Sequence, residues 1–258
     1  GGELRLGVSL RALRRLRDEA VQAAEHEGRP RAWRTWEDPP SRREAGAKLT
    51  TEDTCYELVR PKTQAARCPF FTVLESGDVG PATCFVSHAW AYLFEATVGA
   101  VERAGLPEDT FYWFDLFMNS QWDTSTRPFA WWRDTFQGAV GSIGRTLLVL
   151  SPWHAPVPLR RAWCLLEIFA TVTRDAELLV HLPAADEVAF EEALSEEFDS
   201  IARSLSALSL RKAEAFNADD QQRIMEAVEQ SPGGVARLDE VVLQALRDWL
   251  PAAGPRGP

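Results

Sequence analysis

The sequence of 258 residues is 45% hydrophobic and 26% charged, which is the composition of a globular protein rather than of a collagen-like, disordered or coiled-coil chain. Its longest apolar runs, such as residues 146–150, are far shorter than the roughly 20 residues that a membrane-spanning helix needs, so we expect no transmembrane segment. A formal net charge of −10 argues against a general nucleic-acid binder, because such proteins carry a basic surplus.

The first 50 residues differ in charge from the rest. They carry 11 Lys/Arg against 8 Asp/Glu, whereas residues 51–258 carry 17 against 30. Leucines at near-helical spacing predict an amphipathic helix over residues 4–26. A basic amphipathic helix can lie on a membrane, but acidic residues such as Asp18 and Glu19 interrupt its positive face. Docking on its own domain or on a neighbouring chain is therefore the favoured interpretation.

Further along the chain, apolar patterns between turn signals predict a series of short elements. The expected helices after the first are residues 51–60 (ending before Pro61), 90–104, 132–143, 159–173, 186–204, 218–229 and 237–250. The expected strands are residues 83–87, 111–116, 146–150, 177–182 and 207–210, and residues 70–74 form a further apolar element. Strands that alternate with helices require crossover connections, which predicts a mostly parallel sheet with helices on both faces.

The cysteines and histidines show no metal-ligand spacing. Cys55, Cys68, Cys84 and Cys164 form no CxxC pair, and the four histidines add no zinc pattern. We therefore expect no metal site, free thiols in a reducing compartment, and a cytoplasmic location. Nucleophile-elbow, HExxH and P-loop motifs are also missing from the sequence.

One carboxylate stands out within an otherwise apolar helix. Glu167 lies in the run Ala-Trp-Cys-Leu-Leu-Glu-Ile-Phe-Ala at residues 162–170, and a carboxylate in such a setting is either paired or functional. Trp163 precedes it by four residues and projects from the same helix face. An indole beside an acid can form a binding pocket for a flat, charged ring. Two alternatives remain open: Glu167 as a structural carboxylate and Trp163 as a core residue.

Ligands of open α/β sheets bind outside the carboxyl ends of the strands. Six residues lie at or just after the carboxyl ends of the expected strands. Four of them have an alternative role: a hydrogen-bonded loop residue for His88, capping or loop closure for Asp115, and aromatic packing for Trp90 and Trp153. The predicted substrate-binding residues besides Trp163 are Ser87, His88, Trp90, Asp115, Ser151 and Trp153.

Residues 84–88 (Cys-Phe-Val-Ser-His) resemble the first-strand box of the Toll/interleukin receptor (TIR) domains. Residues 146–151, followed by residues 161–168 (Arg-Ala-Trp-Cys-Leu-Leu-Glu-Ile), resemble the strand, loop and W-C-L-x-E-L-type helix of plant TIR domains. The similarity extends over about residues 82–210.

The resemblance implies a flavodoxin-like fold with five parallel strands. It divides the chain into an N-terminal helical or irregular extension (1–80), a TIR-like α/β domain (81–212) and a C-terminal helical extension (213–258). Enzymatic TIR domains cleave NAD at the nicotinamide–ribose bond, and the glutamate of this helix is their catalytic residue, which corresponds to Glu167. The resemblance therefore implies a signalling NAD glycohydrolase of immune or stress pathways, with NAD as substrate rather than cofactor, activated by self-association through TIR–TIR contacts.

The chemistry is consistent with a single carboxylate. Nicotinamide in NAD is a cationic pyridinium that departs neutral, so no general acid is needed, and a carboxylate can stabilise the developing oxocarbenium charge. Capture by water gives ADP-ribose, and capture by an internal group gives a cyclic product; the sequence leaves both open. Two other functions are also open: a non-enzymatic TIR interaction module, and a nucleoside hydrolase or deoxyribosyltransferase.

Overall fold

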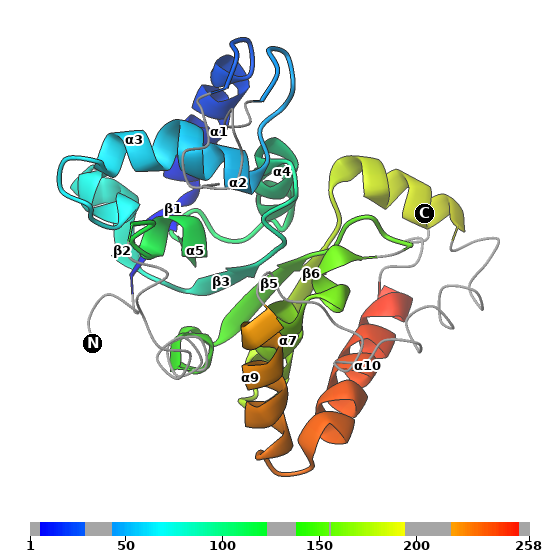
Figure 1. Cartoon of the computed structure of the whole chain (residues 1–258). Helices are drawn as coiled ribbons and strands as arrows, with labels where there is room; N and C mark the ends of the chain where they lie inside the picture. Colours follow the sequence, from blue (N-terminus) through cyan, green and yellow to red (C-terminus); the bar gives the residue numbers. More distant parts are fainter. Residues whose placement is uncertain (1–5, 29–42, 123–137, 155, 194–217, 253–258) are drawn as a thin grey trace. The chain divides into compact units, whose positions relative to one another are not determined.

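The computed structural model describes residues 6–28, 43–122, 138–154, 156–193 and 218–252 (Figure 1). The chain divides into two compact units. Unit 1 comprises Gly1–Thr83 and Trp90–Arg127, and unit 2 comprises Cys84–Ala89 and Pro128–Pro258. The protein is of the mixed α/β class, and the strands in the described residues pair in both senses, antiparallel in unit 1 and parallel in unit 2.

Unit 1 contains an antiparallel arrangement that the sequence did not predict. Strand β1 (Leu6–Ser9) pairs with β2 (Val79–Pro81) on one side and with β4 (Phe111–Trp113) on the other. At Gly7 a Cβ atom would lie 2.9 Å from the backbone of Phe111 and Tyr112, so only glycine permits this close strand contact. The expected helix over residues 4–26 is therefore wrong in its first part, which is a strand.

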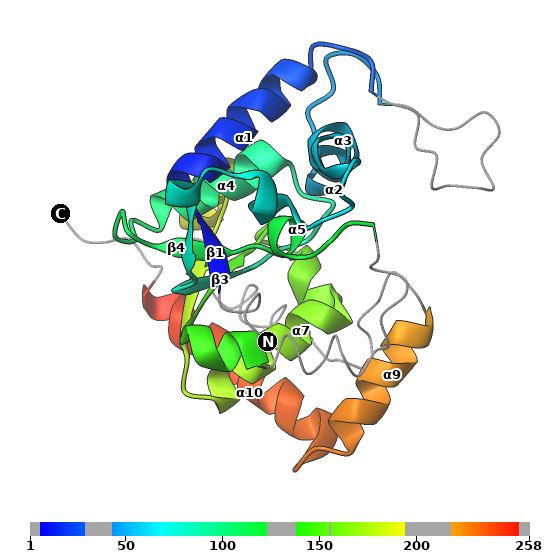
Figure 2. The ribbon, with the colours of Figure 1, turned by 90° about the vertical axis from the view of Figure 1, so that its left-hand side faces the viewer.

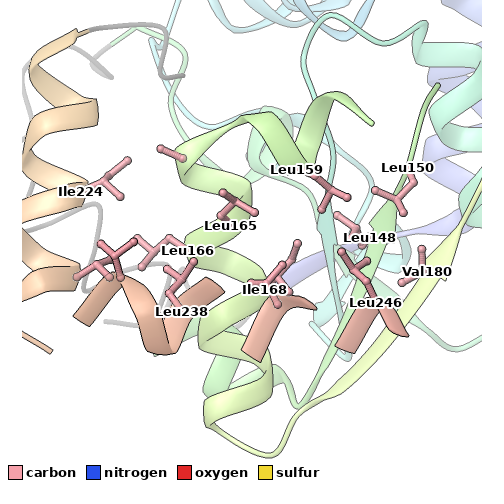
Figure 3. Close-up of a cluster of buried hydrophobic side chains, with 14 of the residues drawn as sticks. Leu148, Leu150, Leu159, Leu165, Leu166, Ile168, Val180, Ile224, Leu238 and Leu246 are labelled. Atoms are coloured by element: carbon pink, nitrogen blue, oxygen red, sulfur yellow. The ribbon is translucent and has the colours of Figure 1, made fainter. Parts of the chain in front are cut away.

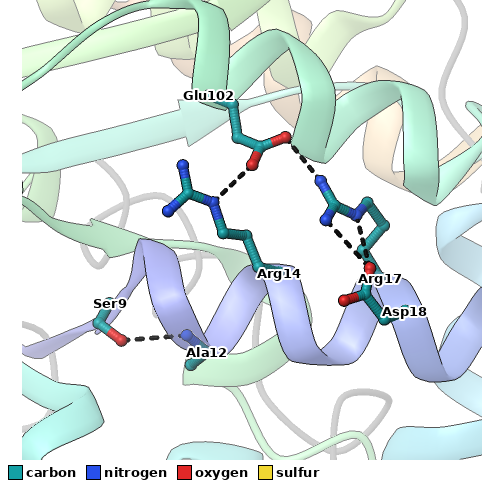
Figure 4. Close-up of polar contacts among 6 residues, drawn as sticks. All are labelled: Ser9, Ala12, Arg14, Arg17, Asp18 and Glu102. Atoms are coloured by element: carbon teal, nitrogen blue, oxygen red, sulfur yellow. Dashed lines mark hydrogen bonds and ion pairs between the residues drawn. The ribbon is translucent and has the colours of Figure 1, made fainter.

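Helix α1 (Leu10–Ala23) begins where the Ser9 hydroxyl accepts a hydrogen bond from the Ala12 N–H at 3.1 Å. It packs on α4 (Phe94–Arg103) within unit 1 (Figure 2), and its buried residues are Ala12, Leu13, Leu16 and Ala20. Arg14 and Arg17 both bind Glu102 of α4, at 2.5 and 2.6 Å (Figure 4). Docking on its own domain is thus confirmed, and these two arginines form ion pairs within the unit.

A continuous helical segment runs from residue 51 to residue 63 in unit 1. It consists of α2 (Thr51–Thr54), a π-helical turn (Cys55–Val59) and α3 (Arg60–Thr63), which contains Pro61 in its first turn. The expected end before Pro61 is wrong because the π turn changes the hydrogen-bond register, with the Arg60 N–H bonding to the Cys55 carbonyl. Pro61 lies in the first turn of α3, where proline is tolerated because a residue there does not need its N–H for a helical hydrogen bond.

Unit 1 also contains three short helical elements and an aromatic core. Residues 70–74 were expected to be a short apolar element, and Phe70–Val73 form a 3-10 helix there, followed by a second at Ser76–Asp78. The expected strand over 111–116 ends at Trp113, because α5 (Asp115–Met118) follows directly. Neighbouring ring centroids in the core lie 5.1–6.2 Å apart, and its members are Phe70, Phe94, Phe114 and Phe117. Helix α4 begins four residues later than expected.

Unit 2 contains a parallel arrangement of β3 (Cys84–Ser87), β5 (Arg145–Val149) and β6 (Glu177–His181), with β5 paired to both others. These three strands confirm predicted elements to within about one residue at either end. The predicted five-stranded parallel sheet is wrong as a whole, because β1 pairs antiparallel with β2 and β4 in unit 1. The predicted strand at residues 207–210 lies outside the described residues.

The two C-terminal helices of unit 2 pack against α7 (Ala162–Thr173). Helix α7 starts three residues later than expected because Val157–Arg160 form a 3-10 turn that includes Pro158. The predicted C-terminal helices are confirmed as α9 (Ala218–Glu229) and α10 (Gly234–Ala252). Figure 3 shows the apolar side chains of α7 meeting those of α9 and α10 in one buried cluster.

Two predicted helices of unit 2 are described only in part, at residues 138–143 and 184–193, and the remainder of each lies outside the described residues. Across the described ranges, no helix combines the length and apolar character that crossing a membrane requires. The four cysteines are free, with Cys68 half-buried and the other three buried.

Candidate active site

Helix α7 presents different side chains to the helices and to the strands of unit 2. Leu166 and Ile168 belong to the apolar cluster with α9 and α10 (Figure 3). Three other residues of α7, spaced three and four apart, contact the strands instead. Cys164 contacts His88, the residue after β3; Glu167 contacts Ser87 of β3; and Thr171 contacts Thr146 of β5. This spacing places one residue per helical turn along the side of α7 that faces the strands.

Glu167 is held by a serine at the end of β3. The Ser87 hydroxyl donates a hydrogen bond to the Glu167 Oε2 at 2.5 Å, and the Glu167 residue is only 9% exposed. A hydrogen bond to an ionised carboxylate is stronger than one between neutral groups. Ser87 and Glu167 were both predicted site residues, and the structure brings them into direct contact.

The backbone of Glu167 is anchored as well. Its carbonyl accepts a hydrogen bond from the Thr171 hydroxyl at 2.7 Å, and Thr171 Oγ1 lies 2.8 Å from Thr146 Oγ1 of β5. Thr146 pairs with Phe85 in the strand register, and Ser87 is two residues beyond Phe85, so the two hydroxyl-bearing residues share a sheet face. Hydroxyl groups on two neighbouring strands therefore fix the position of Glu167.

His88 directly follows β3 and is buried. Its carbonyl oxygen accepts a weak hydrogen bond from Cys164 Sγ at 3.9 Å. Burial lowers the pKa of the His88 imidazole from 6.5 to about 3, so the ring is neutral at pH 7. A neutral imidazole can exchange hydrogen bonds with a ligand but supplies no positive charge to a phosphate.

Ser151 and Trp153, which follow β5, share a partner that the sequence analysis missed. The Ser151 hydroxyl donates to Asp186 Oδ2, and the backbone N–H of Trp153 donates to Asp186 Oδ1 at 3.3 Å. The indole of Trp153 packs on Phe190, with centroids 5.8 Å apart. Asp186 was predicted only as the start of an acidic helix, and the signal that could have singled it out is its place just after β6.

The strand register explains why these groups gather within unit 2. Ser87 lies opposite Leu148, and the Leu150 N–H donates to the His181 carbonyl at 3.0 Å. Since β3, β5 and β6 are parallel, their carboxyl ends lie at the same edge, as do the residues that follow them. This edge is where ligands of open α/β sheets bind.

Trp163 is half-buried and packs against the apolar cluster of unit 2. It lies one helical turn before Glu167 on α7. The contact with the cluster supports a packing role for this indole.

Trp90 and Asp115 belong to unit 1, where they contact each other. The Trp90 Nε1–H donates to Asp115 Oδ2 at 2.6 Å, and the Leu116 N–H donates to Asp115 Oδ1 at 2.7 Å. Loss of hydration in this setting raises the pKa of the Asp115 carboxyl from 3.8 to about 6, although both hydrogen bonds oppose the rise. Six of the eight predicted residues thus fall into three hydrogen-bonded groups: Ser87 with Glu167, Ser151 and Trp153 through Asp186, and Trp90 with Asp115. Of the other two, His88 bonds Cys164 through its carbonyl, and Trp163 packs on the apolar cluster.

Among the residues that the structure describes, no group of three or more His, Cys, Asp or Glu side chains is placed to hold a metal ion. Comparison of the chain with protein-family models, curated proteins and solved structures finds no match. The features that bear on function are therefore the geometry around Glu167 and the sequence motif that contains it.

Proposed function

We propose that this chain is a TIR-like NAD glycohydrolase in which Glu167 is the catalytic residue. The observation that carries the proposal is the Glu167 carboxylate, nine-tenths buried in an apolar helix and held by Ser87 at the carboxyl end of β3. Burying a carboxylate is costly unless hydrogen bonds compensate for it. A carboxylate kept in such a place is a candidate for electrostatic catalysis.

In the proposed reaction, the bond between the ribose C1′ and the nicotinamide nitrogen breaks, and its electron pair goes to nicotinamide, which leaves neutral. The positive charge moves to the ribose as an oxocarbenium-like species. Glu167 stabilises that charge, and the Ser87 hydroxyl orients the carboxylate. Water then bonds to C1′ and releases a proton, giving ADP-ribose, or an internal nucleophile gives a cyclic isomer.

Self-association and a role in cytoplasmic immune or stress signalling are part of the same proposal, because they follow from the family resemblance. The described arginines of α1 bear on the geometry of assembly. Arg11 and Arg15 bind Asp78, and Arg14 and Arg17 bind Glu102, all within unit 1. A contact between copies through α1 would therefore have to use charged side chains other than the ones already in these pairs.

A second candidate is a non-enzymatic TIR interaction module. The specific observation in its favour is the same 2.5 Å bond from Ser87, which would also satisfy Glu167 as a structural carboxylate. The two candidates differ in what the carboxylate charge does. Catalysis requires the negative charge, whereas a structural hydrogen bond survives replacement by the neutral amide of glutamine.

The test follows the release of nicotinamide from NAD by the purified full chain at high protein concentration. Variants are Glu167→Gln, Ser87→Ala and, as a matched control, Glu226→Gln, an exposed glutamate on α9 that contacts Gln222. Removing one group that stabilises transition-state charge lowers kcat about a hundredfold or more. We expect this loss for Glu167→Gln, a smaller loss for Ser87→Ala, and unchanged turnover for Glu226→Gln.

Other outcomes contradict the proposal. No nicotinamide from concentrated wild-type protein would leave the interaction module as the better account. Release that persists in folded Glu167→Gln would assign catalysis to another residue. Turnover of nucleosides without turnover of NAD would support a nucleoside hydrolase or deoxyribosyltransferase.

A further inference from the structure

Two arginines in unit 1 stack on one tryptophan. The guanidinium carbon of Arg60 lies 4.3 Å from the ring centroid of Trp122, and that of Arg67 lies 5.6 Å from it. Arg60 also lies over the ring of Tyr56, at 5.2 Å. Both distances to Trp122 are within the range of cation–π attraction. We call Arg60, Arg67 and Trp122 the arginine–tryptophan cluster.

The indole of this cluster is fixed in place by hydrogen bonds. Trp122 Nε1 donates to Thr63 Oγ1 at 3.0 Å, and the Thr63 hydroxyl donates to the Val59 carbonyl at 2.8 Å. The residue before it, Gln121, donates from Nε2 to the backbone carbonyls of Asp115 and Leu116 in α5 and of Asn119 just after it, at 3.0–3.2 Å. These hydrogen bonds hold the indole of the cluster in place without a ligand.

Arg67 has a backbone conformation that favours glycine. Its φ is +47°, and its N–H donates to the Thr63 carbonyl at 2.8 Å, which closes the C-terminal end of the helical segment 51–63. Glycine is the usual residue at such a helix end, because a side chain there is strained. The Ser120 hydroxyl also binds the Arg67 carbonyl, at 3.1 Å. A long cationic side chain at a strained position is a feature typical of functional sites.

The arginines of the cluster differ from those of the nearby helix α1 in their ion pairing. Each of Arg11, Arg14, Arg15 and Arg17 forms an ion pair with a carboxylate. Within the described ranges, no carboxylate forms an ion pair with Arg60 or Arg67. The Arg67 side chain is exposed, and Arg60 and Trp122 are half-buried. Two positive charges held on one ring, with no ion pair to a carboxylate of the described residues, favour the binding of an anion.

We propose that the arginine–tryptophan cluster binds a phosphoryl group. A phosphoryl group carries up to two negative charges and three acceptor oxygens, which match the planar donor forks of two guanidinium groups. A single carboxylate would neutralise only one of the two charges. The phosphoryl group can come from free phosphate or from the end of a nucleotide, and the site is separate in the chain from Glu167, which lies in unit 2.

The experiment titrates inorganic phosphate and, separately, ADP into the full chain by isothermal calorimetry, with indole ¹H–¹⁵N resonances as a second readout. The variants are Arg60→Gln and Arg67→Gln, and the matched control is Arg103→Gln, an exposed arginine on α4 of the same unit. Because Arg67→Gln keeps the strained backbone position, Arg67→Gly serves as a variant that removes the side chain without that strain. Circular dichroism confirms that each variant is folded.

We expect wild-type protein to bind phosphate or ADP with an affinity that falls as salt rises. Loss of one charge-assisted contact weakens binding about tenfold or more, so Arg60→Gln, Arg67→Gln and Arg67→Gly should all show it, and Arg103→Gln should not. Binding of inorganic phosphate identifies the free anion as sufficient, and binding of ADP alone identifies a nucleotide phosphate. The proposal is overturned if wild type binds neither probe, or if folded Arg67→Gly binds as well as wild type. Glu167→Gln should bind phosphate normally, which separates this result from that of the NAD assay.

Discussion

Thr146 of β5 and Thr171 of α7 meet through hydroxyl oxygens that lie 2.8 Å apart, both fully buried. Thr171 uses its single proton to bond the Glu167 carbonyl at 2.7 Å. The proton between the two hydroxyls therefore belongs to Thr146, which donates to Thr171. This order of donors makes the two threonines unequal, although they form one pair.

The first prediction follows from that inequality. Thr171→Val removes the acceptor of Thr146 and leaves the Thr146 hydroxyl buried without its partner, so we expect a loss of about 1–3 kcal/mol in the free energy of unfolding. Thr146→Val leaves the bond from Thr171 to Glu167 intact and should cost about 1 kcal/mol. Urea unfolding measures both values. Equal losses, or a larger loss for Thr146→Val, would contradict the assigned direction of the bond.

The second prediction concerns Asp78, a fully buried carboxylate in unit 1. Burial alone raises the pKa of Asp78, but hydrogen bonds from Arg15, Ser9 and Arg11 outweigh it, so the pKa is lowered below 3.8. A lowered pKa means that the stabilisation is present above pH ~4, the unfolded value, and is lost as pH falls through the folded value. We expect Asp78→Asn to destabilise the protein by about 1–3 kcal/mol at pH 7.

The measurement for Asp78 is unfolding by urea at pH 7 and at several values below pH 4. The difference between wild type and Asp78→Asn should shrink as the pH falls, because the wild-type carboxyl becomes protonated. Glu108→Gln, an exposed substitution in the same unit, provides the control. A difference that stays constant down to the lowest pH would show that the charge of Asp78 does not stabilise the fold.

The sequence predicts the parallel strands of unit 2 well and the antiparallel strands of unit 1 poorly. Buried parallel strands appear as continuous apolar runs, and the runs at β3 and β5 are of this kind. The strands β1 and β2 have only four and three residues and contain Gly7, Gly80 and Pro81. Glycine and proline usually indicate turns, whereas Gly7 is needed here for close strand contact.

The candidate site could be predicted in part, for similar physical reasons. Glu167 is identifiable because a carboxylate is rare in an apolar helix, and Ser87 because it ends a strand. The bond between them depends on the packing of α7 against β3, which local sequence does not determine. Thr146 and Thr171 were missed because a buried threonine in an apolar run looks like a packing residue. Asp186 was missed because an acidic residue near a helix start is an ordinary capping signal.

The third prediction concerns Asp115, whose carboxyl accepts hydrogen bonds from Trp90 and from the Leu116 N–H. Loss of hydration raises its pKa to about 6. In the unfolded chain the Asp115 carboxyl ionises at pH ~4. Between pH 4 and 6 it is therefore charged in the unfolded state, whereas the folded state disfavours that charge. The contribution of Asp115 to stability is therefore largest below pH ~4 and is lost as pH rises through 6.

For Asp115 we expect Asp115→Asn, which keeps an oxygen acceptor for Trp90, to gain stability relative to wild type as pH rises from 4.5 to 7.5. The gain should be about 1 kcal/mol, after allowance for solvent screening of a half-buried group. A ¹³C NMR titration of the Asp115 carboxyl gives the direct check, with a midpoint near 6. Asp109→Asn, at an exposed site, should show no such trend. A midpoint near 4 for Asp115 would contradict the assignment.

The fourth prediction tests whether α10 is part of the core that positions α7. Leu238 of α10 is fully buried in the cluster that contains Leu166 and Ile168 of α7 (Figure 3). Leu238→Ala removes buried methyl groups and leaves a cavity, which costs about 2–5 kcal/mol of unfolding free energy. Because the same packing holds the helix that carries Glu167, amide exchange along α7 should also become faster.

The control for Leu238 is Gln244→Ala, an exposed substitution on the same helix that removes only a bond to Asp248. It should change stability by no more than about 0.5 kcal/mol. Urea unfolding and hydrogen exchange by mass spectrometry provide the two readouts. If Leu238→Ala cost no more than Gln244→Ala and left exchange in α7 unchanged, α10 would not stabilise α7. The hydrogen bonds that link Glu167 to Ser87, Thr171 and Thr146 would then hold its position without help from α10.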